Sequence, residues 1–189
     1  MSINWEATFQ AGLPYERFLA KYAKPEKDLP RWQEVYGQVR LTADQGAVLS
    51  AMVRSMNVLC IAGAWCGDCV DQGPILQRIA EASAGKVDLR FLDRDDYPDA
   101  QAEVALCGGH RVPVTVFLSE DFHECARVGD RTLAKYRQMA AERVGWSCPT
   151  GTGGADGLLA AATQEWVDHF ERVGLMLRLS PRLRELHDD

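Results

Sequence analysis

Two cysteines separated by two residues are the strongest candidates for chemistry in this sequence. Cys66 and Cys69 belong to the segment Trp65-Cys66-Gly67-Asp68-Cys69, which directly follows an apolar run over residues 57–62. At this spacing in the first turn of a helix, two sulfur atoms lie close enough to form a disulfide with little strain. The free N–H groups and the dipole of the helix start favour a thiolate on the first cysteine. The segment therefore predicts dithiol–disulfide chemistry, with Cys66 attacking and Cys69 resolving a mixed disulfide.

Metal binding is an alternative use of the same sulfur atoms. Cys107 and His110 form a C-x₂-H unit, so Cys66, Cys69, Cys107 and His110 together could hold zinc or an iron–sulfur cluster. The gap between the two units is longer than in ordinary structural zinc sites, so we expect no metal. The chain has six cysteines. We expect reduced thiols with catalytic or buried roles, because the chain is too long for a typical small disulfide scaffold.

The elements that would position the cysteines alternate between strand and helix patterns. Asp88 and Arg90 alternate with Val87, Leu89 and Phe91, as in a half-buried strand. By the same reasoning we expect strands at 57–62, 87–92, 112–118 and 125–128, and helices at 66–82, 99–106 and 131–144. This order predicts an α/β fold with a mixed sheet and helices on both faces.

The two ends of the chain lie outside this alternation. Residues 1–41 are rich in aromatic residues and interrupted by prolines, so we expect a helical N-terminal extension with one helix at 14–22. Its aromatic residues are expected to cover a sheet edge or one face of the domain; they are Trp5, Tyr15, Trp32 and Tyr36. Thr42-Ala-Asp-Gln45 is typical of a capping box that opens a helix through about residue 54.

The C-terminal part is predicted to be a flexible joint followed by one long helix. Residues 149–157 are rich in glycine and should form a linker. Beyond it, large apolar residues recur every three or four positions from Leu159 to Leu177, and Pro181 should end the helix. We expect this helix, within residues 158–189, to pack on its own domain, with a homodimer contact as the alternative.

Charge and hydropathy exclude two broad functional classes. The formal net charge is −6, which gives no electrostatic support for binding nucleic acid. The longest apolar run covers residues 58–64, far short of the ~20 residues of a membrane span. The first residues lack the basic and apolar regions of a secretory signal, so we expect a cytoplasmic protein.

Residues from about 42 to 145 resemble the thioredoxin family. The resemblance rests on four motifs in the family's order: the Trp65–Cys69 segment in place of Trp-Cys-Gly-Pro-Cys, Pro74 in the following helix, Val112-Pro113 before a β-rich run, and Val128-Gly129. It implies a three-layer thioredoxin-like fold over residues 42–148, with helical extensions at both ends.

The resemblance also implies an activity, a set of site residues and a set of partners. The activity is thiol–disulfide oxidoreduction through a redox-active disulfide, with no organic cofactor. Pro113 should follow a cis peptide bond and present the backbone of Val112 to the substrate, while Trp65, Gly67 and Gly129 shape the approach. The partners would be disulfide-containing proteins or small molecules, and a reductase or small thiol as electron donor.

Two departures from the family pattern bear on activity. Asp68 replaces the proline between the cysteines, and its carboxylate should raise the pKa of Cys66. Cys60 occupies the position of the family's buried aspartate, and Leu89 that of its lysine partner. Turnover should therefore be slower, with water or a carboxylate such as Asp71 accepting the proton of Cys69. The alternative function is a thioredoxin-fold binding module with weak redox activity.

Overall fold

The computed structural model describes residues 3–145 and 154–189, and within them the strands form one mixed sheet. The sheet has the order β2-β1-β3-β4, with β1 at Met56–Ala62, β2 at Val87–Asp93, β3 at Val114–Ser119 and β4 at Glu124–Gly129. β1 runs parallel to β2 and antiparallel to β3, and β3 runs antiparallel to β4. The expected α/β architecture with a mixed sheet is confirmed.

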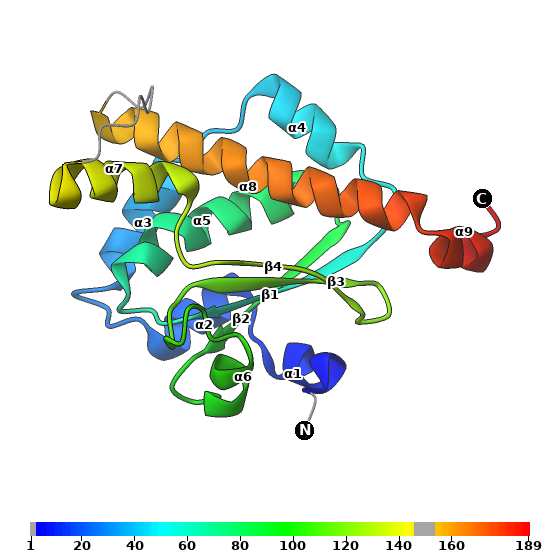
Figure 1. Cartoon of the computed structure of the whole chain (residues 1–189), viewed down its shortest axis with the longest axis horizontal. Helices are drawn as coiled ribbons and strands as arrows, with labels where there is room; N and C mark the ends of the chain where they lie inside the picture. Colours follow the sequence, from blue (N-terminus) through cyan, green and yellow to red (C-terminus); the bar gives the residue numbers. More distant parts are fainter. Residues whose placement is uncertain (1–2, 146–153) are drawn as a thin grey trace.

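Helices cover both faces of the sheet. Figure 1 shows α5 (Gly67–Ala82) and α8 (Gly154–Leu179) together on one face, with α1 (Trp5–Ala11) and α6 (Pro98–Glu103) on the other. β1 and β3 are buried along nearly their whole length, because they are the central strands and both of their faces are covered. The end of β1 leads through a short loop into α5, so the C-x₂-C segment lies at the edge of the core.

The N-terminal helices pack beside β2 and α5. They are α2 (Tyr15–Tyr22), α3 (Leu29–Gln38) and α4 (Ala43–Ser50). The capping box that opens α4 is present, although α4 ends at Ser50, before the expected position. Trp32 of α3 is fully buried, so it belongs to the core and does more than cover a surface.

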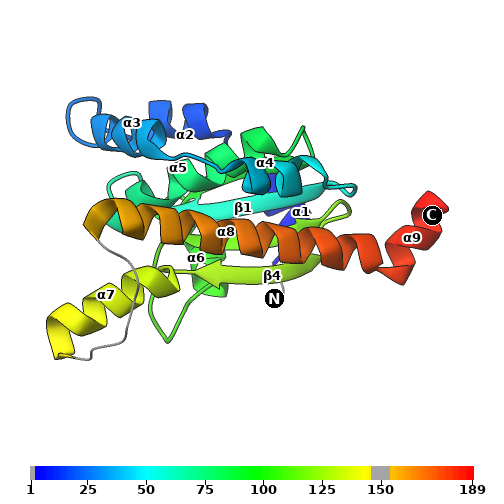
Figure 2. The same ribbon diagram turned by 90° about the horizontal axis from the view of Figure 1, so that it is seen from above.

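The C-terminal part docks on its own chain. α7 (Leu133–Val144) ends at Gly145 in the left-handed conformation, and Figure 2 shows α8 running along the sheet with α9 (Pro181–His187) at its far end. Trp166 and Phe170 of α8 are buried against the sheet, which confirms the expected packing. Pro181 does not only end a helix, since it also occupies the first turn of α9.

The glycine-rich joint predicted at residues 149–157 falls mostly outside the described residues. Residues 149–153 are not described, and α8 already begins at Gly154. Among the helices that the structure describes, none is long and apolar enough to cross a membrane.

Candidate active site

Cys66 is the N-cap residue of α5 and therefore lies at the positive end of the helix dipole. Its backbone is extended (φ −77°, ψ 127°), and its N–H donates to the Gly63 carbonyl at 2.9 Å. Its own carbonyl accepts the N–H of Val70 at 3.0 Å, the first bond of the helix. The side chain is half-buried, so the sulfur keeps a path to solvent while facing the free N–H groups of the first turn.

Cys69 lies one turn further and is buried, and both cysteines are free thiols. Hydrogen bonds from the Cys69 thiol, then from the N–H groups of Cys69 and Asp68, lower the pKa of Cys66 to about 7, against burial and the Asp68 carboxylate. Burial, followed by the Cys66 sulfur, raises the pKa of Cys69 well above its usual value. The motif thus combines an accessible acidic thiol with a buried thiol that stays protonated.

The loop before β3 lies against Cys66. The Val112–Pro113 peptide bond is cis, and in its protonated form Cys66 Sγ donates to the Val112 carbonyl at 3.5 Å. Gly129, at the end of β4, lies so close to Pro113 that no side chain fits there, because a Cβ atom would lie 2.7 Å from the Pro113 oxygen. Val112 and Pro113 therefore lie beside Cys66, and Gly129 packs against Pro113.

Trp65 forms an exposed apolar surface next to Cys66. Its side chain is 52% exposed, and the guanidinium of Arg94 lies 5.8 Å from its ring centroid. A Cβ atom at Gly63 would lie 2.9 Å from the indole, so the ring packs closely on the loop backbone. An exposed tryptophan beside a reactive thiol offers contact area to an incoming peptide.

Trp32 contacts both the loop before the C-x₂-C motif and helix α5. Sequence reasoning did not assign it to the site. Its indole N–H donates to the Ala64 carbonyl at 2.8 Å, immediately before the motif. Its ring packs on Gly73 of α5, where a Cβ atom would come within 2.2 Å of it. Helix α3 therefore fixes the start of α5, a role that no local pattern in the sequence indicates.

A cluster of charged side chains lies between the first turn of α5 and the loop that joins β4 to α7. The Asp68 carboxylate pairs with Arg131 at 2.6 Å, and Arg131 also reaches Asp130 at 3.2 Å. Asp130 follows a cis peptide bond from Gly129 and is buried, with Arg111 and the Tyr136 hydroxyl as further partners. Sequence reasoning identified Asp68 but not the partners that hold it.

Cys60 sits in β1 directly opposite Thr115 of β3 and is almost fully buried. Burial raises the pKa of Cys60 to about 12, so this thiol is not a base at neutral pH. Asp71, the carboxylate proposed as an alternative proton acceptor, is half-exposed and lies 3.5 Å from Lys135. The position of the family's buried acid is thus filled by a small apolar side chain, as expected.

The metal arrangement has no geometric support. Cys107 is exposed in a turn with positive φ, and His110 is exposed as well. Within residues 3–145 and 154–189, no three His, Cys, Asp or Glu side chains are grouped so that they could hold a metal ion. Cys148 lies outside the described residues.

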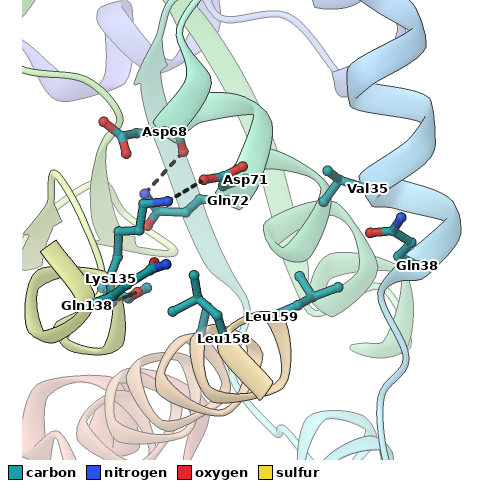
Figure 3. A pocket seen from close by; sticks show the side chains of 11 residues that line it. Val35, Gln38, Asp68, Asp71, Gln72, Lys135, Gln138, Leu158 and Leu159 are labelled. Atoms are coloured by element: carbon teal, nitrogen blue, oxygen red, sulfur yellow. Dashed lines mark hydrogen bonds and ion pairs between the residues drawn. The ribbon is translucent and has the colours of Figure 1, made fainter. Parts of the chain in front are cut away.

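A cavity of about 460 Å³ borders the motif on the side of Asp68. Figure 3 shows its lining from α3, α5, α7 and α8, with polar side chains from the first turns of α5 and α7 facing apolar ones from α8. The polar groups include Asp68, Asp71 and Lys135, and the apolar wall includes Leu158 and Leu159. The cavity has the size of a small-molecule site, and Asp68, which lies between the two cysteines in the sequence, is part of its lining.

A mixed sheet in this order, a helix that starts at a C-x₂-C motif and a cis-proline beside the first cysteine define the class of thioredoxin-fold proteins. The family model described as Thioredoxin matches residues 12–142. The chain therefore belongs to this thioredoxin family. The match begins within the segment expected to be an N-terminal extension, so α2 and α3 are part of the matched region.

Two crystal structures are similar to this fold. A protein of unknown function from Pseudomonas aeruginosa is 16% identical, with a TM-score of 0.71 over 91% of this chain and 99% of that chain. An HIV epitope scaffold is 17% identical, with a TM-score of 0.66 over 90% of this chain and 99% of that chain. At these identities the likeness shows the fold alone. No curated protein matches the chain.

Proposed function

We propose that the protein is a thiol–disulfide oxidoreductase that reduces disulfides of proteins or small molecules through Cys66 and Cys69. The observation that carries the proposal is the asymmetry of the two thiols. The pKa of Cys66 is lowered to about 7, first by the hydrogen bond from Cys69, whereas burial raises that of Cys69. At neutral pH the accessible thiol is the nucleophile, and the buried thiol waits for the mixed disulfide.

The reaction proceeds in two balanced exchange steps. The Cys66 thiolate attacks one sulfur of the substrate disulfide, forming a mixed disulfide and releasing the other sulfur as a thiolate that takes up a proton. Cys69 then loses its proton and attacks Cys66 Sγ. The mixed bond breaks, the second substrate thiol leaves, and two electrons have passed from the protein to the substrate. The dithiol needs no organic cofactor, and a reductase or a small thiol regenerates it.

The surroundings of Cys66 suit an extended peptide substrate. The Val112 carbonyl lies 3.5 Å from Cys66 Sγ, in the loop before β3, and the Val112 side chain is buried. Its backbone can pair with a peptide in the manner of an added strand, while Trp65 provides apolar contact. Gly129 lets the end of β4 approach the loop before β3 closely, because a Cβ atom there would lie 2.7 Å from the Pro113 oxygen.

The proposal is tested by insulin reduction with dithiothreitol as the electron donor. We expect the wild-type protein to accelerate precipitation of the insulin B chain above the uncatalysed rate. Cys66→Ser should abolish the acceleration, because it removes the attacking sulfur. Cys107→Ser is the matched control: it removes an exposed thiol outside the motif and should leave the acceleration unchanged. Equal rates for wild type and Cys66→Ser would favour the binding module instead.

A further inference from the structure

The carboxylate of Asp68 is an unfavourable neighbour for a thiolate on Cys66. Asp68 lies in the first turn of α5, two residues after Cys66. A negative charge near a thiol raises its pKa, and Asp68 acts on the pKa of Cys66 in this direction, after the larger effects of the Cys69 hydrogen bond and burial. The Asp68 side chain is only 18% exposed, so water screens its charge weakly. Offsetting this charge would favour the thiolate form of Cys66.

Arg131 provides the opposite charge at short range. Its Nη2 lies 2.6 Å from Asp68 Oδ2, and the two side chains are 24% and 18% exposed. Its Nη1 lies 3.2 Å from Asp130 Oδ2, so one guanidinium joins both carboxylates. Asp130 is itself fixed, since it is 5% exposed and also contacts Arg111 and Tyr136. Arg131 is therefore held in place instead of being a mobile surface charge.

The Gln72 side chain also connects the first turn of α5 to the loop after β4. Gln72 of α5 donates from Nε2 to the Asp130 carbonyl at 2.8 Å and to the Asp68 carbonyl at 3.2 Å. Its Oε1 accepts the indole N–H of Trp166 from α8 at 3.1 Å. The first turn of α5 and the loop after β4 are thus joined by the Asp68–Arg131 ion pair and by hydrogen bonds from the Gln72 side chain to a backbone carbonyl of each segment. The guanidinium of Arg131 faces Asp68 because the first turn of α5 and the loop after β4 are both held in place.

We propose that Arg131 is a positioning residue that keeps Cys66 nucleophilic by holding and neutralising the Asp68 carboxylate. The guanidinium draws the carboxylate towards the loop after β4, and the paired charges cancel most of each other's field at the sulfur. This inference rests on the proposed role of Cys66 as the attacking thiol. It adds that Arg131 offsets the unfavourable charge of the aspartate that lies between the two cysteines.

The test is the pH dependence of Cys66 alkylation in the reduced full-length protein, followed by mass spectrometry of the peptide that contains Cys66. Arg131→Gln should move the midpoint to higher pH and slow alkylation at pH 7 about two- to fivefold, because an unpaired carboxylate raises the thiol pKa. Asp68→Asn should keep the midpoint at or below that of the wild type. The double variant should behave like Asp68→Asn, because without the carboxylate Arg131 has nothing to neutralise.

Arg127→Gln is the matched control, because it removes an arginine of similar exposure that pairs with Glu103 and Glu124 and leaves Asp68, Arg131 and Asp130 intact. Its midpoint should equal that of the wild type. The proposal is overturned if Arg131→Gln leaves the midpoint unchanged, or if the double variant shifts as far as Arg131→Gln alone. If circular dichroism shows that Arg131→Gln does not fold, Asp68→Asn decides, since a midpoint above the wild-type value contradicts the proposal.

The alkylation experiment is independent of turnover. A shifted midpoint in Arg131→Gln together with no insulin reduction by the wild type would support the ion-pair role and contradict the proposed function. The reverse result, with insulin reduction intact and no shift, would contradict only the role of Arg131.

Discussion

Cys66 and Cys69 are one helical turn apart but lie in different surroundings. Cys66 is half-buried at the N-cap of α5, whereas Cys69 is enclosed by the core and accepts only the Gly63 N–H at 3.5 Å among the described hydrogen bonds. Burial therefore raises the pKa of one thiol, while hydrogen bonding, first from Cys69, lowers that of the other. This difference sets the order of attack in the proposed reaction.

Cys60 is a buried thiol at the position where the family has a buried acid, and this substitution leads to a prediction. Cys60→Asp should accelerate insulin reduction at pH 7 by about tenfold, because a positioned general base is worth ~10²–10⁴-fold and this one would be placed without optimisation. The same variant should be less stable than the wild type, because it buries an unpaired carboxyl group.

Cys60→Asn is the matched control, since it has nearly the same shape and no basic group. Its rate should remain at the wild-type level. Equal rates for the Asp and Asn variants, both folded by circular dichroism, would show that deprotonation of Cys69 does not limit turnover.

The sequence identified the residues of the motif but not those that position them. The spacing of Cys66 and Cys69 after an apolar run, and the Val112-Pro113 pair, indicate a shared site because the family places them so. Arg131 is distant in sequence and reaches Asp68 only through the path of the loop after β4. An ion pair of this kind carries no local signature, so it requires the folded structure.

At the level of elements, α3 holds α5 and the loop before it in place. Trp32 packs on Gly73 and donates to the Ala64 carbonyl, so one side chain fixes both the helix and the loop before it. The sequence predicted most of this framework: the capping box at Thr42, the apolar β1 and the glycine that ends α7 are local patterns. It did not predict α9, because Pro181 can end one helix and also begin another.

The contact between α3 and α5 gives a stability prediction. Gly73→Ala should lower the free energy of unfolding by about 2 kcal/mol, because the new Cβ atom would lie 2.2 Å from the Trp32 ring and the core must shift to accept it. The measurement is urea denaturation followed by circular dichroism.

Gly46→Ala in α4 is the control, because a Cβ atom there meets nothing within 4 Å. This change should stabilise the protein by about 0.5–1 kcal/mol through helix propensity. If Gly73→Ala were as stable as Gly46→Ala, Trp32 would not be packed on α5 as described.

In the molecule as a whole, α8 packs beside α5 on the face of the sheet next to the C-x₂-C motif (Figure 1). The family match ends at residue 142, yet α8 packs its apolar side on the sheet and on α5. Phe170 meets Phe117 of β3 edge to face at a centroid distance of 5.0 Å, and Trp166 reaches Gln72 beside the motif. The C-terminal helix is therefore part of the domain core, and this placement follows from its amphipathic pattern.

Because α8 packs on the sheet with one side only, substitutions on its buried and exposed sides should have very different effects on the free energy of unfolding. Phe170→Ala should cost about 3–5 kcal/mol of unfolding free energy, because it leaves a cavity in the core. Leu175→Ala, on the same helix but 54% exposed, should change stability by no more than about 0.5 kcal/mol. Comparable losses in both variants, dependent on protein concentration, would indicate instead that α8 packs in a homodimer.

A redox titration shows whether Cys66 and Cys69 form a redox-active dithiol. Alkylated thiols are counted by mass across buffers of defined potential, in the wild type and in Cys66→Ser. We expect a two-thiol transition below about −230 mV, in the range of reducing dithiols, and its loss in the variant. A midpoint between about −120 and −180 mV would contradict the reducing direction. Absence of any two-thiol transition in the wild type would contradict the oxidoreductase itself.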